Sequence, residues 1–421
     1  MTDNKVIKKE SVFSNKTNRS NYFFWLGFVI YSLSFTISTS GSVNFIACQM
    51  LQIVGLLLLV SASIFLVQWK FDSDYLRTMF SLYIFWTFTI IIRGFTFDYQ
   101  SLKFMLFDST FGIMLYFAPF ILLFPRNLAF YKKAFDVLVI LGIAYLLYDF
   151  IFLKDLLAPG RNLRSQAILE YFSQNLSLPC GLLLITYIYH TKKSRLLALS
   201  VIVLTFLLAA IRARRGLMFI SINILIFSFL IYFYVHKVKI IVFIFSLILI
   251  SSVYLIGAKI YNENKHDLFG YVTARLDENT RTGVEAYFYK DMNLVSWTIG
   301  KGINGLYYCP GIDGSESGLF TINRGVIETG YLQLILKGGI ISLGLLLLIA
   351  IPAVFKGIFY SKNILSKAAG IWVLLFLISL YPSVPVNFSM GYLLVWISIA
   401  ICYSDEIREM PDTTVSELLS H

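Results

Sequence analysis

The chain has 421 residues, of which 57% are hydrophobic, 17% aromatic and only 14% charged. A soluble domain carries about 25% charged residues, so this composition excludes a soluble globular enzyme and indicates a polytopic membrane protein. The formal net charge of +11 would suggest a nucleic-acid partner in a soluble protein. Here much of the excess falls in short loops between apolar runs, where lysine and arginine set the orientation of the helices, so no nucleic acid is expected.

The amino-terminal segment 1–20 is polar and basic, and the apolar run after it has no small-residue cleavage site. We therefore expect a cytoplasmic tail followed by a first membrane helix, not a removed signal peptide. The four cysteines of the chain show no metal-type spacing, so neither a disulfide nor a metal site is expected.

Apolar runs of spanning length predict an all-α polytopic membrane protein with about twelve transmembrane helices. Nine of them would lie within residues 21–258 and three within residues 327–404. Between the two groups, segment 259–326 has no hydrophobic span and is expected to form one large loop, and residues 405–421 form a second polar tail. The apolar runs cover residues 22–38, 43–67, 77–95, 108–124, 135–153, 175–190, 196–211, 216–235, 240–258, 327–355, 368–384 and 388–403.

Lysine and arginine set the expected orientation. With the first tail in the cytoplasm, most basic clusters fall on the cytoplasmic side, both termini are cytoplasmic and the large loop is extracytoplasmic. The tight turn Arg212-Ala213-Arg214-Arg215-Gly216 breaks this rule, because it places three arginines outside. Moving it inside would invert Lys192-Lys193-Arg195 or Lys237-Lys239, or would require a well-formed span to be false. We keep the turn outside and interpret the violation as a sign of function.

The arginines of this turn have two interpretations. Each would cost roughly 2.5–3.5 kcal/mol at the bilayer centre, but at the boundary Arg212, Arg214 and Arg215 could snorkel and simply anchor the helix. Alternatively they bind a polyanion, because guanidinium pairs bidentately with phosphate and a charge-assisted hydrogen bond contributes ~1.5–3 kcal/mol. Arg215, directly before the next span, is the strongest candidate. Arg161 and Arg164 in the preceding outer loop could supply the same chemistry or be solvated loop charges.

The run at 327–355 is too long for one straight helix across ~30 Å of hydrocarbon, and Lys337-Gly338-Gly339 in its middle predicts a break or a strong tilt. Glu328 lies at its start. A carboxylate there is stabilised by the helix dipole by ~0.3–1 kcal/mol, which is one interpretation. The other is a general base that takes a proton from a sugar hydroxyl, or a group that orients that sugar.

The segment Ile299-Gly300-Lys301-Gly302 lies in the large loop and is reminiscent of a phosphate loop, but it lacks the Walker serine or threonine after the lysine. It is also predicted on a side where no ATP is available. Its glycines are expected to form tight turns. These turns either approach a substrate, with Trp297, Tyr307 and Tyr308 as stacking faces for a sugar, or serve loop packing alone.

The order of these parts resembles the O-antigen polymerase and ligase superfamily of membrane glycosyltransferases. The resemblance covers residues 155–355 and rests on Arg215-Gly216, on Arg281 ahead of a glycine turn, on the glycine segment at 299–302, and on the helix start Glu328-Thr329-Gly330-Tyr331. Ligases of this superfamily often carry a histidine-asparagine pair where this chain has glutamate and threonine. The difference favours a polymerase of the Wzy type.

The resemblance implies a metal-independent, inverting membrane glycosyltransferase of the GT-C type without a cofactor, at the outer face of a bacterial inner membrane. It would join repeat units into O-antigen, capsule or exopolysaccharide. Its partners would be undecaprenyl-pyrophosphate-linked glycans as donor and acceptor, together with membrane lipids, and a chain-length regulator is a further candidate partner. The leaving diphosphate needs cations more than an acid. The candidate diphosphate ligands are Arg215, Arg212, Arg214, Arg281, Arg164 and Arg161, with Glu328 as the base and Tyr331 aligning the sugar.

Other classes of protein stay open. A ligase would share the whole site and differ in its acceptor. A flippase for lipid-linked oligosaccharides would also need arginines, but it should line a membrane-deep cavity with them and not confine them to one face. A sensor or structural membrane protein needs no arginine turn. The enzymatic hypothesis therefore predicts that arginines from separated parts of the chain converge at one membrane face, beneath the large loop.

Overall fold

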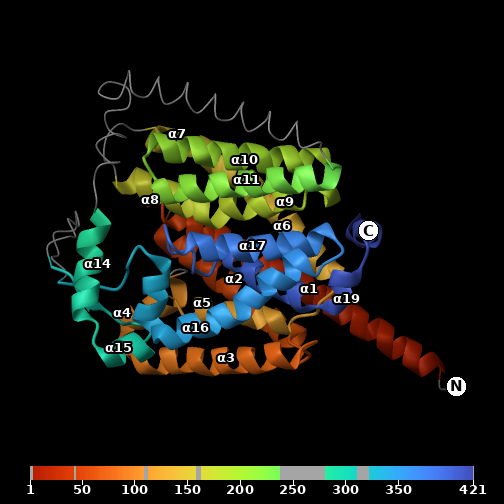
Figure 1. Ribbon diagram of the computed structural model, residues 1–421, viewed down its shortest axis with the longest axis horizontal. Helices are drawn as coiled ribbons and strands as arrows, with labels where there is room; N and C mark the ends of the chain where they lie inside the picture. Colours follow the sequence, from red (N-terminus) through yellow and green to blue (C-terminus); the bar gives the residue numbers. More distant parts are fainter. Residues whose placement is uncertain are drawn as a thin grey trace.

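The computed structural model describes residues 3–41, 44–108, 112–157, 163–237, 280–310 and 322–420. In these ranges the chain is mainly helical, and many helices run along the longest axis of the molecule (Figure 1). The elements are α1 (Asp3–Ser38), α2 (Phe45–Leu66), α3 (Asp74–Gly94), α4 (Tyr99–Phe107), α5 (Met114–Phe117), η1 (Ala118–Leu123), α6 (Leu128–Ile151), α7 (Leu153–Leu156), α8 (Leu163–Phe172), η2 (Ser173–Ser177), η3 (Leu178–Cys180), α9 (Gly181–Ile185), η4 (Tyr187–Tyr189), α10 (Lys192–Ile211), α11 (Arg215–His236), α14 (Thr280–Asp291), α15 (Leu294–Ile299), β1 (Tyr307–Tyr308), β2 (Asn323–Arg324), α16 (Gly330–Phe359), α17 (Ile364–Ser379), α18 (Met390–Tyr403), α19 (Asp405–Glu409) and α20 (Asp412–Ser420).

Within the described ranges, seven helical stretches are long and apolar enough to cross a membrane. They are α2, α3, α6, α10, α11, α16 and the composite stretch Arg164–Ile185, and shorter apolar helices lie at Met114–Leu123, Ile364–Ser379 and Met390–Tyr403. The protein is therefore an all-α polytopic membrane protein, as its composition predicts. The count of twelve spans stays a prediction, because the predicted span at 240–258 lies outside the described residues.

Two predicted spans are irregular. The run at 108–124 is described as the single turn α5 followed by the 3₁₀ helix η1, which has Pro119 in its first turn. The run at 175–190 starts earlier, in α8, and continues through the π-helix η2 and the 3₁₀ helix η3 before α9. Pro179 has no N–H with which to continue an α-helical hydrogen-bond ladder, which gives a physical reason for the change of helix type.

The two ends of the bundle differ. Figure 1 shows both chain termini at one end of the molecule and α14 and α15 at the other. Exposed aromatic side chains occur near both ends, for example Trp69 and Tyr360 on one side and Phe97 and Tyr99 on the other. Aromatic rings concentrate at the two interfaces of a membrane, so this distribution fits a bundle that spans one along its long axis.

The polar tail predicted at 405–421 is folded against the bundle. α20 buries Val415 and Leu419. Asp412 in its first turn accepts a hydrogen bond from the Tyr189 hydroxyl and another, of 2.8 Å, from the backbone N–H of Ile364 at the start of α17. The carboxylate thereby connects the tail to two membrane segments, and the carboxy-terminal residues form part of the bundle's end.

The predicted break in the long helix α16 is present at Gly339, whose φ of 70° and ψ of −177° are not helical. The left-handed φ favours glycine, and a Cβ atom at this position would lie 2.1 Å from the carbonyl oxygen of Thr298 in α15. Glycine is therefore required both by the backbone conformation and by the close approach of α15.

The break exposes carbonyl groups at the end of the first half of α16, and other segments satisfy them. The N–H groups of Lys301 and Gly302 donate to the carbonyls of Leu336 and Lys337 at 2.8 and 2.9 Å. The indole N–H of Trp86 in α3 donates to the Gly338 carbonyl at 2.7 Å. A buried backbone carbonyl without a donor costs free energy comparable to a lost hydrogen bond, so these contacts stabilise the break.

The same segment of the large loop is attached to α3. The Arg93 guanidinium donates to the carbonyls of Ile299 and Gly300 at 2.7 and 3.1 Å. Lys301 forms an ion pair with Asp291. These contacts favour the loop-packing interpretation of the glycine segment, because its backbone faces α16 and its lysine is engaged within the loop.

The break generates a stability prediction. Gly339→Ala should lower the free energy of unfolding by about 2 kcal/mol or more, because alanine is strained at a left-handed φ and its methyl group would meet the Thr298 carbonyl. Gly344→Ala is the control on the same helix, since a Cβ there meets nothing within 4 Å. The control should be neutral or slightly stabilising. Equal melting temperatures for the two purified variants would contradict the break.

Candidate functional site

Three distant parts of the chain meet at residues 380–389, the connection between α17 and α18. The N–H of Gly330, at the start of α16, donates to the carbonyls of Leu380 and Ser383 at 2.7 and 3.1 Å. The Arg281 guanidinium in α14 donates to the Pro382 carbonyl at 2.6 Å. Gly216 approaches the same carbonyl, because a Cβ at this glycine would lie 3.2 Å from it. The arginine turn, α14 and the start of α16 therefore share one support.

The arginine turn closes α10 with a tight, strained cap. Ala213 has a φ of 52°, and its N–H and that of Arg214 donate to the carbonyls of Ala210 and Ala209 at 3.1 and 2.8 Å. This pattern is a Schellman motif, whose left-handed position is usually occupied by glycine. Alanine there costs about 1–2 kcal/mol, and strained residues of this kind concentrate at functional sites.

The three arginines of the turn have different surroundings. Arg212 is buried, with an exposed fraction of 2%. Arg214 donates to Gln166 Oε1 at 3.1 Å and forms an ion pair with Glu170 at 3.5 Å, both in α8. Arg215 is exposed in the first turn of α11. A cation at a helix amino terminus is disfavoured by the dipole, so the corner is electropositive and an anion would be stabilised there.

The structure describes only part of the loop that precedes α8. Arg164 lies 3.9 Å from Asp155, and its side chain is half exposed. Arg161 lies outside the described residues. The structure therefore places α8 against the arginine turn through Gln166 and Glu170.

The predicted base and one predicted phosphate ligand are in contact. Arg281 Nε lies 3.3 Å from Glu328 Oε2, with the two side chains 35% and 48% exposed. One turn further along α14, Glu285 Oε1 accepts a hydrogen bond of 2.5 Å from the Thr329 hydroxyl. α14 therefore binds the Glu328-Thr329 pair through two adjacent polar contacts. Sequence reasoning missed Glu285, for which the i, i+4 spacing from Arg281 was the available signal.

Tyr331 is directed away from this polar cluster. Its hydroxyl donates to the Leu377 carbonyl in α17 at 2.6 Å. The bond holds the tyrosine between the two helices, so in this conformation its hydroxyl does not meet Glu328. A structural role in packing α16 on α17 follows directly from this contact.

An apolar groove starts beside the shared support. Its walls come from α11, α17 and the irregular stretch η3, and Ser383, which lies next to Gly216, is at its rim. The side chains that line it are Gln174, Leu178, Pro179, Ile220, Ile224, Trp372, Leu375, Phe376, Ser379, Ser383, Pro385, Asn387, Ser389, Gly391 and Val395. The groove is therefore mostly apolar, with amide and hydroxyl groups where it approaches the arginine turn.

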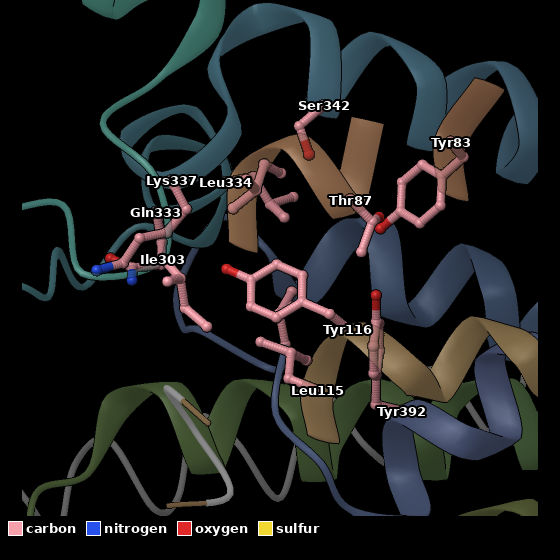
Figure 2. Close-up of a pocket in the computed structure, with 12 residues that line it drawn as sticks. Tyr83, Thr87, Leu115, Tyr116, Ile303, Gln333, Leu334, Lys337, Ser342 and Tyr392 are labelled. Atoms are coloured by element: carbon pink, nitrogen blue, oxygen red, sulfur yellow. The ribbon is translucent and has the colours of Figure 1, made fainter. Parts of the chain in front are cut away.

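A second, central pocket, drawn in Figure 2, borders the 380–389 connection. Val386 lines this pocket, whereas its neighbours Pro385 and Asn387 line the groove. The connection thus forms a partition between the two spaces.

No family model, no curated protein and no solved structure matches this chain.

The strained cap generates a prediction of its own. Ala213→Gly should be neutral or stabilising, because relief of about 1–2 kcal/mol of left-handed strain exceeds the loss of one buried methyl group, about 0.8 kcal/mol. Ala213→Val should lower the free energy of unfolding by about 2 kcal/mol or more, since a β-branched residue tolerates this φ least. Melting temperatures of the purified variants in the opposite order would show that the turn has another geometry.

Proposed function

We propose that this protein is a polymerase that joins undecaprenyl-pyrophosphate-linked oligosaccharide repeat units at the outer face of a bacterial inner membrane. The observation that supports the proposal is the convergence of the arginine turn, Arg281 and Glu328 on the 380–389 connection, beside an apolar groove. This arrangement offers cations for a diphosphate, a carboxylate for an acceptor hydroxyl and an apolar surface for a prenyl chain.

The orientation belongs to the proposal. Both termini lie at the end of the bundle opposite α14 and α15 (Figure 1). With the termini in the cytoplasm, the lysine-rich connections are inside and the arginine turn is outside. Lipid-linked repeats that have been transferred across the membrane would meet the turn at this outer end.

The diphosphate of the donor would be held by Arg215 and Arg281. The first lies exposed beside Gly216, and the second donates to the Pro382 carbonyl, which Gly216 also approaches. Each charge-assisted hydrogen bond from a guanidinium contributes about 1.5–3 kcal/mol. Fixed cations of this kind stabilise the negative charge that develops on the leaving diphosphate.

Binding of the diphosphate would also release the base. The pair between Arg281 and Glu328 is partly exposed, so its net contribution is about 0–1 kcal/mol, less than that of a guanidinium bound to phosphate. The diphosphate therefore displaces Glu328 from Arg281. The freed carboxylate takes the proton of the acceptor hydroxyl as that oxygen attacks the anomeric carbon, and the bond between this carbon and the diphosphate oxygen breaks with its electron pair on the diphosphate.

The groove supports a transferase over a flippase. Neither the groove nor the central pocket has an arginine among its described lining residues, so the described candidate cations do not line either space. A flippase would need them at membrane depth. A ligase shares every feature named here and differs only in its acceptor, so the products of the reaction separate these two enzymes.

The first activity prediction concerns Arg215. Purified protein incubated with one lipid-linked repeat unit should give a ladder of products. Arg215→Ala should slow formation of this ladder by about 100-fold, because the variant loses roughly 3 kcal/mol of interaction with the phosphate. Arg77→Ala is the control, because this exposed arginine pairs with Asp74 in the first turn of α3, away from the turn. It should keep the ladder.

The outcome also tests the class of enzyme. An unchanged ladder with Arg215→Ala would show that the arginine turn is not part of the site. Transfer to a different lipid acceptor, without any ladder from repeat units alone, would identify a ligase. Comparable amounts of both variants in the membrane, measured by immunoblot, exclude loss of protein as the cause.

The second activity prediction concerns Glu328. Glu328→Gln should lower kcat by about 100-fold or more with little change in KM, the usual size of a general-base contribution. Near-normal turnover of purified Glu328→Gln would reduce Glu328 to a structural contact.

A further inference from the structure

The central pocket lies at the break in α16 and has no role in the proposed reaction. α3, the α5–η1 stretch, α16 and α18 form its walls, and Ile303 of the large loop covers it (Figure 2). Its volume is about 40 Å³. Since one water molecule needs about 10–15 Å³ of such volume, the pocket has room for a few waters or one small ion, but not for a sugar ring.

Hydroxyl groups face this pocket from several helices. Figure 2 shows those of Tyr83, Thr87 and Tyr392 directed into the same part of the pocket, and that of Tyr116 directed toward Ile303 and Lys337. Thr87 and Ser342 have exposed fractions of only 4% and 5%.

The hydroxyls of Thr87 and Ser342 are open to the pocket. A helical threonine commonly donates to a carbonyl of the preceding turn, as Thr89 does to Trp86 at 2.8 Å. Within the described part of the chain, the Thr87 and Ser342 hydroxyls make no such bond, and both residues line the pocket. Their protons are therefore available to an occupant of the pocket that accepts hydrogen bonds.

The helix break adds positive potential. The second half of α16 starts after Gly339 with Ser342 in its first turn, and a helix amino terminus carries about half a positive charge. The carbonyl end of the first half is already satisfied by Lys301, Gly302 and Trp86. The helix end that faces the pocket is therefore the amino terminus of the second half of α16. Such an amino terminus favours anionic groups.

The charged residue in the lining of the pocket is also positive, like the helix amino terminus. Lys337 is the charged residue among the described residues that line it, and no aspartate or glutamate lines it. Its ammonium is directed to the loop side, where it donates to the Gly305 carbonyl at 2.9 Å. A lining with a lysine and without a described carboxylate gives a cation no ligand of opposite charge.

We propose that the pocket binds one small monovalent inorganic anion, with chloride as the test ligand, hydrogen-bonded by the hydroxyls of Thr87 and Ser342. The anion complements the amino terminus of the second half of α16. The bound anion thereby fixes the angle between the two halves of α16. It also fixes the orientation of the first half, which starts at Gly330. The proposal depends on no step of the proposed polymerase reaction.

The test uses the melting temperature of the purified full-length protein. Chloride in place of gluconate, at equal ionic strength, should raise the wild-type melting temperature by about 2 °C or more at saturation, because it binds only the folded state. Thr87→Val and Ser342→Ala should lose this shift. Thr89→Val is the matched control, since it removes the same group two residues away on α3 and should keep the shift.

A direct observation completes the test. Crystals grown in bromide should give an anomalous peak between the side chains of Thr87 and Ser342. Water alone at this position in saturating bromide would overturn the proposal, and so would a chloride shift that both hydroxyl variants retain. If Thr87→Val does not fold, Ser342→Ala provides the same comparison from the opposite helix.

Discussion

A broken helix leaves buried backbone carbonyls without their helical donors, and this constraint organises the structure around Gly339. Once α16 leaves helical geometry there, the carbonyls of Leu336, Lys337 and Gly338 need donors from elsewhere in the protein. The large loop supplies two of these donors and α3 supplies the third. A loop that satisfies backbone groups in this way cannot move away freely, so the break attaches an extramembrane segment to the bundle.

The attachment has consequences for the candidate site. The segment that satisfies the break continues from α15, which directly follows α14, and α14 carries the arginine and glutamate that contact Glu328 and Thr329. From the other direction, Gly330 is held by the 380–389 connection, against which Gly216 packs. The position of each candidate group therefore depends on backbone contacts between remote segments. This dependence makes the site rigid at its base, while its charged ends stay partly exposed.

Patterns that follow from local physics could be predicted from the sequence. An apolar run that is too long for the membrane and has two glycines at its centre predicts the break in α16. The apolar runs themselves predict the fold class. The contact partners of individual side chains could not be predicted. The direction of the Tyr331 hydroxyl toward Leu377, the contact of Glu285 with Thr329 and the packing of the glycine segment on α16 all join positions far apart in the chain. The π and 3₁₀ turns near Pro179 also required the tertiary structure, because proline specifies that a hydrogen bond is lost but not which helix type replaces it.

Several candidate arginines are paired with carboxylates of the same chain, and this arrangement is compatible with binding of a diphosphate. Arg214 pairs with Glu170, Arg164 lies near Asp155 and Arg281 pairs with Glu328. Without such partners, a cluster of guanidinium groups at a membrane surface would repel itself and lose order. Partly exposed pairs contribute about 0–1 kcal/mol each, so they orient the arginines at little cost to a ligand that displaces the carboxylates. A dianionic group that contacts two guanidiniums would gain more than the pairs lose, and the carboxylate that it displaces would be free to contact another part of the ligand.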